Sequence, residues 1–213
     1  MMDKNAKIYV AGHRGMVGSA IVRELQRQGY NNIITRTHKE LDLCRQENVE
    51  KFFAEEKPEY VFLAAAKVGG IVANQEALAD FMWFNMTLEM NVIHSAWQNG
   101  CKKLEFLGSS CIYPRMAPQP MKESCLLTSE LEKTNEAYAL AKISGLKYCE
   151  FLNRLSHIKH NRCISAPSAE LVYEPHHILR VQLQCIYVRS QISKHAVFLK
   201  LHDFLLHISG QIR

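Results

Sequence analysis

Residues 7–18, Lys-Ile-Tyr-Val-Ala-Gly-His-Arg-Gly-Met-Val-Gly, decide the fold of this chain. The apolar run 8–11 predicts a buried strand that stops at Gly12, and glycines recur at Gly15 and Gly18. Apolar residues then follow at helical spacing, so the layout is strand, glycine turn and helix. Such a turn lets the backbone approach a phosphate group, and the N–H groups at the start of a helix bind anions. We therefore predict that this turn holds the pyrophosphate of a dinucleotide, the alternative being a turn without a ligand.

The alternation of strand and helix continues through the first 155 residues. Short apolar runs bounded by turn residues predict further strands, and amphipathic segments predict helices. This alternation predicts an α/β fold with a doubly wound parallel sheet, in which functional residues lie at the carboxyl ends of the strands. The further predicted strands are 32–35, 59–65 and 103–107. The first predicted helix ends near residue 29, and the later ones span 46–56, 80–99 and 135–155.

The composition fits one globular domain with a core of its own. The chain has 213 residues, of which 47% are hydrophobic and 22% are charged. No apolar run approaches the roughly 20 residues of a membrane span, and the N-terminus lacks the layout of a signal peptide. Seven cysteines without a Cys-x-x-Cys pair favour reduced thiols in the cytoplasm over a disulfide framework or a metal site.

The net charge of +5 raises the question of nucleic-acid binding. Residues 1–154 are almost neutral, with 19 Lys and Arg against 18 Asp and Glu, whereas residues 155–213 have 7 against 3. The first part contains no basic stripe interleaved with aromatic residues. We expect neither a nucleic acid nor a membrane as a partner.

The end of the second predicted strand indicates which dinucleotide binds. Folds that bind NAD place an Asp or Glu there, about 20 residues after the glycines, to hold the ribose 2′-hydroxyl. This chain has Arg36 at that position, followed by His38 and Lys39. A guanidinium binds a 2′-phosphate through two oxygens, so we predict NADP(H) over NAD(H). Arg14 in the glycine turn is a second candidate for a phosphate contact, and a solvated basic turn is the alternative interpretation.

Tyr138 and Lys142 indicate general acid catalysis. They are four residues apart and so share one face of the last predicted helix. An ammonium near a phenol lowers the pKa of the phenol, and such a tyrosine donates a proton to a carbonyl oxygen as a hydride reaches the carbon. Ser109 or Ser110, at the end of the preceding strand, can hydrogen-bond to the same oxygen. The spacing alone arises by chance in many helices, so its weight comes from the phosphate-binding turn upstream.

Four segments resemble the extended short-chain dehydrogenase/reductases, a family whose glycine signature is Gly-x-x-Gly-x-x-Gly. They are AGHRGMVGSAI (11–21), LAAAKVGGIVAN (63–74), FLGSSCIYP (106–114) and TNEAYALAKISGLK (134–147). The resemblance covers residues 6–154 and is strongest to members that act on sugar nucleotides. It implies a Rossmann fold, NADP(H) as cofactor and a GDP-sugar substrate, GDP-4-keto-6-deoxy-D-mannose, which is epimerised at C3 and C5 and reduced at C4. It also implies a homodimer formed by the two long helices.

The resemblance also implies roles for individual residues. Ser109, Tyr138 and Lys142 are the reductase triad, and Cys111 is the base that removes the acidic protons beside the 4-keto group. Without the resemblance, Cys111 is most simply a small buried hydrophobic residue. The family often has Arg where this chain has His38, so an altered cofactor affinity is expected. The predicted cofactor-binding residues are Gly12, His13, Arg14, Gly15, Met16, Val17, Gly18, Arg36, His38, Lys39, Glu40, Leu41, Asp42, Leu43, Leu107, Gly108, Ser109, Ser110 and Lys142.

The resemblance ends near Arg154. Residues 155–213 contain seven of the ten histidines and one of the ten glycines, and their apolar residues follow no sustained period. We interpret them as an unmatched tail, frameshifted or disordered, after a C-terminally truncated NADP-binding domain of residues 1–154. A divergent segment that completes the domain is the alternative.

Two other functions stay open at this point. One is a non-catalytic NADP-binding remnant, which would bind the cofactor without turning over a sugar substrate. The other is a related sugar-nucleotide epimerase or dehydratase, against which Cys111 after two serines argues.

Overall fold

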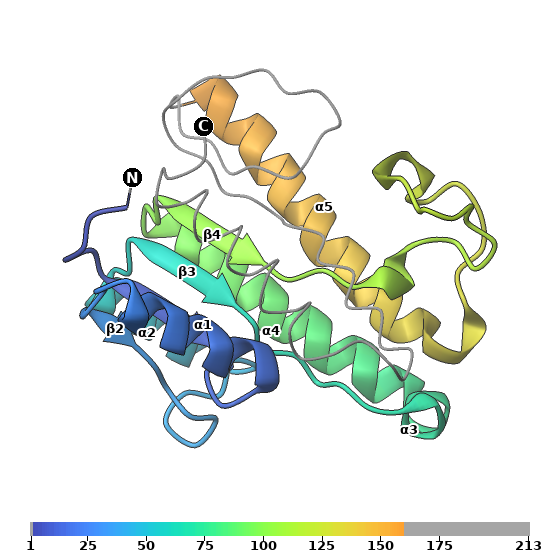
Figure 1. Cartoon of the computed structure of the whole chain (residues 1–213), viewed down its shortest axis with the longest axis horizontal. Helices are drawn as coiled ribbons and strands as arrows, with labels where there is room; N and C mark the ends of the chain where they lie inside the picture. The colour runs from blue at the N-terminus through green and yellow to red at the C-terminus, as the bar shows by residue number, and fades with distance from the viewer. Residues whose placement is uncertain (1, 160–213) are drawn as a thin grey trace.

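A computed structural model describes residues 2–159, which form a parallel sheet with helices around it (Figure 1). Of the predicted tail, residues 155–213, the first five continue the last helix to Lys159, and the part from residue 160 onward lies outside the described residues. The strands are β1 (Ile8–Ala11), β2 (Ile33–Ile34), β3 (Tyr60–Leu63) and β4 (Lys103–Phe106). The α-helices are α1 (Met16–Arg27), α2 (Gln46–Glu56), α3 (Ile71–Glu76), α4 (Leu78–Gln98) and α5 (Glu136–Lys159), and the 3-10 turns are η1 (Ser110–Ile112), η2 (Glu123–Cys125) and η3 (Lys133–Asn135).

The strands lie in the order β2-β1-β3-β4, and all neighbouring pairs are parallel. From β1 the chain passes to β2 on one side and then crosses back to β3 on the other side. β1 and β3 pair along their whole length, from Ile8 opposite Tyr60 to Ala11 opposite Leu63. In such open sheets ligands bind outside the carboxyl ends of the strands, where the direction of winding reverses. The predicted doubly wound parallel sheet is confirmed.

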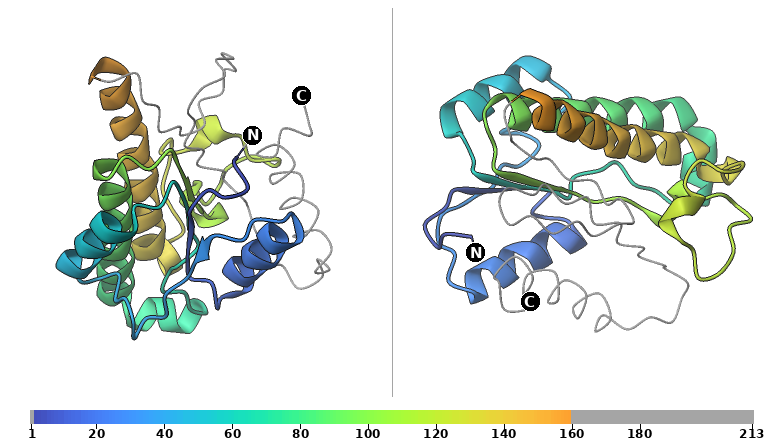
Figure 2. Two further views of the ribbon diagram at one scale, coloured as in Figure 1. Left: turned by 90° about the vertical axis from the view of Figure 1, so that its left-hand side faces the viewer. Right: turned by 90° about the horizontal axis from the view of Figure 1, so that it is seen from above.

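Helices cover both faces of the sheet (Figure 2). α1 covers one face, where Leu25 packs in one core cluster with Val10. α2, α4 and α5 cover the other face, where Phe53 and Leu146 share a core cluster with Phe106. Burial on both faces explains why β1 and β3 are continuous apolar runs. Within residues 2–159, no helix combines the length and the apolar character that a membrane crossing requires.

The structure differs from the predicted elements in two places. A short helix, α3, precedes α4 and was not predicted, because its six residues are too few to show a periodic pattern. β2 has two residues instead of the four predicted. The chain leaves the edge of the sheet early, and residues 35–45 form a loop before α2 begins.

The turn between β1 and α1 depends on two glycines. Gly12 has a φ of +81°, and a Cβ at this position would lie 2.6 Å from the backbone nitrogen of Ala65, just after β3. A Cβ at Gly18 would lie 2.1 Å from the carbonyl oxygen of Gly12. No side chain fits at either position, so the turn lies directly against the loop that follows β3.

We expect Gly12→Ala to destabilise the domain more than Gly29→Ala. Gly29 also has a positive φ, +83°, but a Cβ there would meet no atom within 4 Å. Gly29→Ala therefore measures only the strain of left-handed backbone, on the order of 1 kcal/mol. Gly12→Ala adds the clash with Ala65, which raises the loss to about 3 kcal/mol. Urea unfolding of both variants measures the difference, and equal losses would contradict the close approach at Gly12.

Candidate functional site

A cleft of about 940 Å³ opens at the carboxyl ends of β1, β2 and β3. Its walls are the glycine turn after β1, the loop 36–44 between β2 and α2, and residues 65–67 after β3. This is the point where the winding of the sheet reverses, and the volume suits a small organic ligand. Of the predicted cofactor-binding residues, the cleft is lined by Gly12, His13, Arg14, Gly15, Arg36, His38, Lys39, Glu40, Leu41, Asp42 and Leu43.

The other predicted cofactor-binding residues do not line this cleft. Residues 16–18 form the first turn of α1, directly after the glycine turn. Residues 107–110 follow β4, and Lys142 lies on α5. The structure therefore divides the predicted residues between the cleft and a second group at the end of β4.

The glycine turn offers polar groups that have no partner in the described residues. α1 begins after Gly15 with no side-chain cap, which leaves the N–H groups of its first turn available. Nδ1 of His13 is buried and, within residues 2–159, has no hydrogen-bond partner. Arg14 is exposed beside them. These groups together can bind a phosphate.

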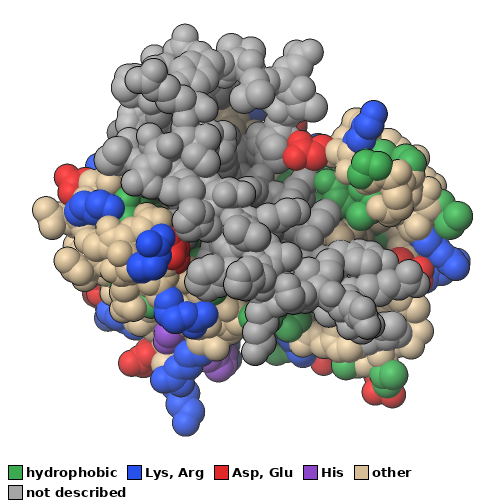
Figure 3. Space-filling model, in the orientation of Figure 1, with side chains coloured by type: hydrophobic (Ala, Val, Ile, Leu, Met, Phe, Trp, Pro, Cys, Tyr) green, Lys and Arg blue, Asp and Glu red, His purple; other side chains and the backbone are tan. Residues whose placement is uncertain are grey.

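The loop between β2 and α2 brings both signs of charge to the cleft, and Lys, Arg and His side chains gather over it in Figure 3. Glu40 accepts hydrogen bonds from the backbone N–H and the hydroxyl of Thr37, both at 2.7 Å, and these bonds lower the pKa of Glu40. Oδ1 of Asp42 lies 3.7 Å from Nδ1 of His38. The carboxylates of Glu40 and Asp42 therefore both interact with residues of the same loop. Lys39 forms no ion pair with another residue of the described part, so its charge is available to a ligand.

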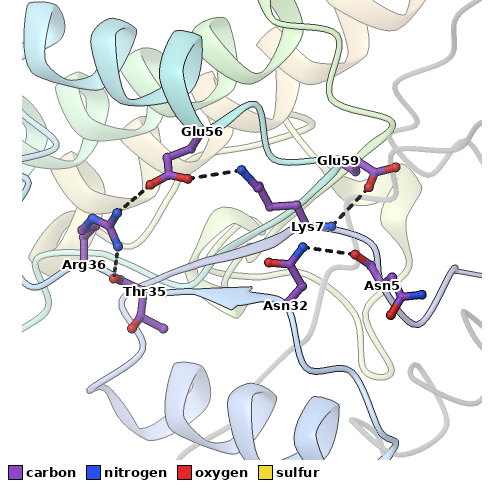
Figure 4. A network of polar contacts seen from close by, with 7 residues as sticks. All are labelled: Asn5, Lys7, Asn32, Thr35, Arg36, Glu56 and Glu59. Carbon is purple, nitrogen blue, oxygen red and sulfur yellow. Dashed lines mark hydrogen bonds and ion pairs between the residues drawn. The ribbon is translucent and has the colours of Figure 1, made fainter.

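Arg36 lines the cleft and is also tied to α2 (Figure 4). Its guanidinium donates to Oε1 of Glu56 at 2.7 Å and to the carbonyl oxygen of Thr35 at 2.9 Å. The other oxygen of Glu56 accepts a bond from Nζ of Lys7 at 3.3 Å. The guanidinium also lies 5.5 Å from the centre of the Phe52 ring. A guanidinium has more N–H donors than these two bonds use, so Arg36 is held in place with donors left for a ligand.

A buried amide fixes the loop that follows β3. Oδ1 of Asn85, on α4, accepts the N–H of Lys67 at 2.8 Å, and its Nδ2 donates to the carbonyl oxygen of Lys67 at 2.9 Å. These bonds satisfy backbone groups beyond the end of the strand. Sequence reasoning missed Asn85. Its signal is a polar residue four positions after Phe81, inside the apolar stripe of a predicted helix.

Ser109 and Cys111 lie together where the chain leaves β4. Oγ of Ser109 caps η1 by accepting the backbone N–H of Cys111 at 3.4 Å. The thiol of Cys111 donates to the same oxygen at 3.1 Å. η1 packs against α5, which places Cys111 close enough to Tyr138 for a charge on the thiol to raise the pKa of the phenol.

Tyr138 and Lys142 lie on one face of α5. Nζ of Lys142 is 5.8 Å from the centre of the Tyr138 ring and 4.6 Å from the centre of the Phe106 ring. The same nitrogen lies 2.8 Å from Oε1 of Glu89, which comes from α4. Sequence reasoning missed Glu89, which sits one position after Leu88 in the apolar stripe.

The pKa of Tyr138 is raised, whereas the spacing to Lys142 predicted a lower value. Burial is the largest cause, and Cys111 and Glu89 add to it. The Glu89 carboxylate offsets the field of the Lys142 ammonium at the phenol. The raised pKa keeps the phenol protonated at neutral pH, so its proton is available, but a phenol in this environment is a weaker acid than a free tyrosine.

A family model described as the NAD dependent epimerase/dehydratase family matches residues 8–160. GDP-L-fucose synthase 1 of Arabidopsis thaliana is 65% identical over 150 residues, which make up 70% of this chain and 46% of the relative. The GDP-L-fucose synthase of Escherichia coli is 57% identical over 148 residues, again 70% of this chain and 46% of the relative. The chain spans about half the length of the curated relatives that it matches.

Solved structures of sugar-nucleotide enzymes also resemble this chain. MlghC, a GDP-mannoheptose C4 reductase from Campylobacter jejuni with NADP bound, is 42% identical with a TM-score of 0.70, over 78% of this chain and 52% of that chain. A GDP-L-fucose synthetase from Naegleria fowleri shares the fold, with a TM-score of 0.69 at 20% identity, over 84% of this chain and 48% of that chain. The region matched by the family model includes the glycine turn, Cys111 and Tyr138. The chain belongs to the NAD dependent epimerase/dehydratase family.

Proposed function

We propose that this chain supplies the cofactor-binding and reducing part of a GDP-L-fucose synthase, which converts GDP-4-keto-6-deoxy-D-mannose to GDP-L-fucose with NADPH. One observation carries the proposal. Ser109, Cys111, Tyr138 and Lys142 gather at the end of β4, at the same edge of the sheet as a cleft with a phosphate-binding turn. A proton donor and a dinucleotide site at one edge of a sheet are what reduction of a keto group requires.

The residues of the cleft fit NADP(H). A Cβ at Gly12 would clash with the backbone of Ala65, and a Cβ at Gly18 would clash with the backbone of Gly12, so glycine at both positions keeps the turn in the compact shape that presents backbone N–H groups to a pyrophosphate. The unpaired Nδ1 of His13 lies in the same turn. Arg36 stands where folds that bind NAD have a carboxylate, and its free donors suit a 2′-phosphate. The NADP bound to MlghC supports the same cofactor for this chain.

The reduction follows from the placement of three side chains. The cofactor, when bound, supplies the hydride that reaches the keto carbon. Tyr138 gives its phenol proton to the carbonyl oxygen, so the keto group becomes a hydroxyl group. Oγ of Ser109 donates a hydrogen bond to the same oxygen, and the ammonium of Lys142 favours the phenolate that Tyr138 leaves behind.

Cys111 is the base of the epimerisation steps, in which it takes a proton from C3 or C5 and a proton delivered to the opposite face of the same carbon inverts the centre. The protons at C3 and C5 are acidic because the neighbouring keto group stabilises the negative charge left by their removal. The thiol donates a hydrogen bond to Oγ of Ser109 at 3.1 Å, so the base lies beside the group that binds the keto oxygen. When the thiol is ionised, the Ser109 hydroxyl turns to donate its one hydrogen to the thiolate, which is the form that removes a proton, and in the later reduction it donates that hydrogen to the keto oxygen instead.

We place the reaction in the cytoplasm. The five cysteines of the described residues, Cys111 among them, are all free thiols. Cys111 must stay reduced to act as a base, and a reducing compartment keeps it so.

We expect the purified chain to bind NADPH at least about tenfold more tightly than NADH, because charge-assisted bonds to the 2′-phosphate add about 1.5–3 kcal/mol. Tyr138→Phe should bind NADPH as the unchanged chain does but lose at least about a hundredfold in reduction of the keto-sugar. Tyr60→Phe, at the amino end of β3 and so at the far end of the strands from Tyr138, is the matched control. Quenching of tryptophan fluorescence measures binding, and consumption of NADPH measures reduction.

The two readouts separate the possible functions. Equal affinity for NADPH and NADH would contradict the interpretation of Arg36. Tight binding of NADPH without turnover of the keto-sugar by the unchanged chain would favour a non-catalytic NADP-binding protein. Turnover that survives in Tyr138→Phe would remove Tyr138 from the role of acid.

We also propose a homodimer that uses the outer surface of α4 and α5. The two helices pack side by side (Figure 2). Each carries a large apolar side chain that is more than half exposed, Trp83 at 57% on α4 and Phe151 at 55% on α5. Aromatic residues exposed on neighbouring helices are typical of a protein interface.

We expect Trp83→Lys to weaken the dimer at least about tenfold, because a charge replaces an aromatic contact in the interface. Met116→Lys is the matched control, since Met116 is 84% exposed in the loop before α5. Sedimentation velocity over a range of concentrations measures the change. A chain that is monomeric at all concentrations, or a Trp83→Lys variant that dimerises like the control, would contradict this interface.

A further inference from the structure

Glu89 and Lys142 form an ion pair in the interior of the described residues. Nζ of Lys142 lies 2.8 Å from Oε1 of Glu89, and the two side chains are 2% and 0% exposed. Gly145 lets the helices come this close, because a Cβ there would lie 3.0 Å from Oε2 of Glu89. The carboxylate therefore reaches Lys142 through a gap in the side chains of α5.

Glu89 is the carboxylate within ion-pairing distance of Lys142 among residues 2–159. Burial raises the pKa of Glu89, while the charge of Lys142 and its hydrogen bond act to lower it. The neighbouring titratable groups on α5 are Tyr138 and Cys149, and burial raises the pKa of both. Cys111 on η1 acts on Tyr138, and Glu105 on β4 acts on Cys149. The ring of Phe106 faces the ammonium at 4.6 Å and adds a weaker attraction.

Stability alone does not account for this pair. A buried ammonium without a counter-ion gives up its proton, because burial penalises the charged form. A buried ion pair, however, often contributes no more stability than two apolar side chains of similar size. Two apolar side chains could therefore fill the positions of Glu89 and Lys142 without loss of stability. What the pair provides instead is a positive charge beside the proposed acid, Tyr138.

We propose that Glu89 is a positioning residue of this site, whose carboxylate keeps Lys142 protonated and held beside Tyr138 before the cofactor binds. The inference rests on the proposed function, in which the Lys142 ammonium takes part in cofactor binding and in proton donation. Glu89 touches neither the cofactor nor the substrate, and acts through Lys142. A protein that lacks the carboxylate would leave the amine of Lys142 buried without a counter-ion.

The protonation state of Lys142 can be observed without a cofactor. We expect NMR spectra of the whole chain with ¹⁵N-labelled lysine side chains to show a protected ammonium signal at about pH 8, absent from Lys142→Met, which identifies it. Glu89→Gln should lose this signal, because the buried cation has no counter-ion. Glu89→Asp keeps the carboxylate and should keep the signal.

Glu24→Gln is the matched control. Glu24 is also a buried glutamate that pairs with a cation, Arg27, but it lies on α1. The control is expected to lose stability while it keeps the Lys142 signal. A second variant covers the outcome that Glu89→Gln does not fold. The double variant Glu89→Leu, Lys142→Met leaves no unpaired charge, so it should fold and bind NADPH weakly. Glu89→Asp, which keeps the carboxylate, then decides the role of the charge.

NADPH titration supplies the second readout. For Glu89→Gln we expect the affinity to fall at least about tenfold from about pH 7 to about pH 9, because only the protonated fraction of Lys142 binds well. The unchanged chain and Glu24→Gln should change by less than about twofold over that range. An ammonium signal that persists in Glu89→Gln, or is lost in Glu89→Asp, would overturn the role of Glu89. Failure of the unchanged chain to bind NADPH would instead overturn the proposed function, while the NMR spectra still decide the role of Glu89.

Discussion

The close approach of two backbone segments holds the site together. The glycine turn after β1 lies against Ala64 and Ala65 after β3, with no room for a Cβ between them. β1 and β3 are the strands between which the winding reverses, so this contact fixes the edge of the sheet where a ligand can enter. The start of α1, the loop after β3 and the cleft between them all depend on the same contact.

The elements of the fold could be predicted because their signals are local. A strand buried on both faces is a continuous apolar run, and a glycine turn has its own spacing, so β1, β3 and the long helices are visible in the sequence. The short helix α3 could not be predicted, because one and a half turns show no period. β2 was predicted too long, since the loop that follows it lines the cleft and its residues do not alternate in the manner of a strand.

The site was predictable in its parts but not in its pairings. Spacing alone shows that Tyr138 and Lys142 share a helix face, yet it does not show that Glu89 offsets the ammonium. The partner of Arg36 is Glu56, which lies 20 residues away on a different element. Asn85 and Glu89 can be recognised in the sequence as unusual, since each is a polar residue at a position that should be apolar in an amphipathic helix. Such positions indicate a buried polar contact without naming the partner.

The two ion pairs that hold basic residues of the site differ in what they can do. The Arg36–Glu56 pair is about one third exposed, so solvent screens it and its net stabilisation is small. Its effect is geometric, because it fixes one edge of a guanidinium and leaves other donors free. The Lys142–Glu89 pair is buried, so the carboxylate is the counter-ion that an ammonium in this position requires. The exposed pair suits Arg36, which is proposed to bind a phosphate at a fixed position. The buried pair suits Lys142, whose charge acts on the neighbouring phenol of Tyr138.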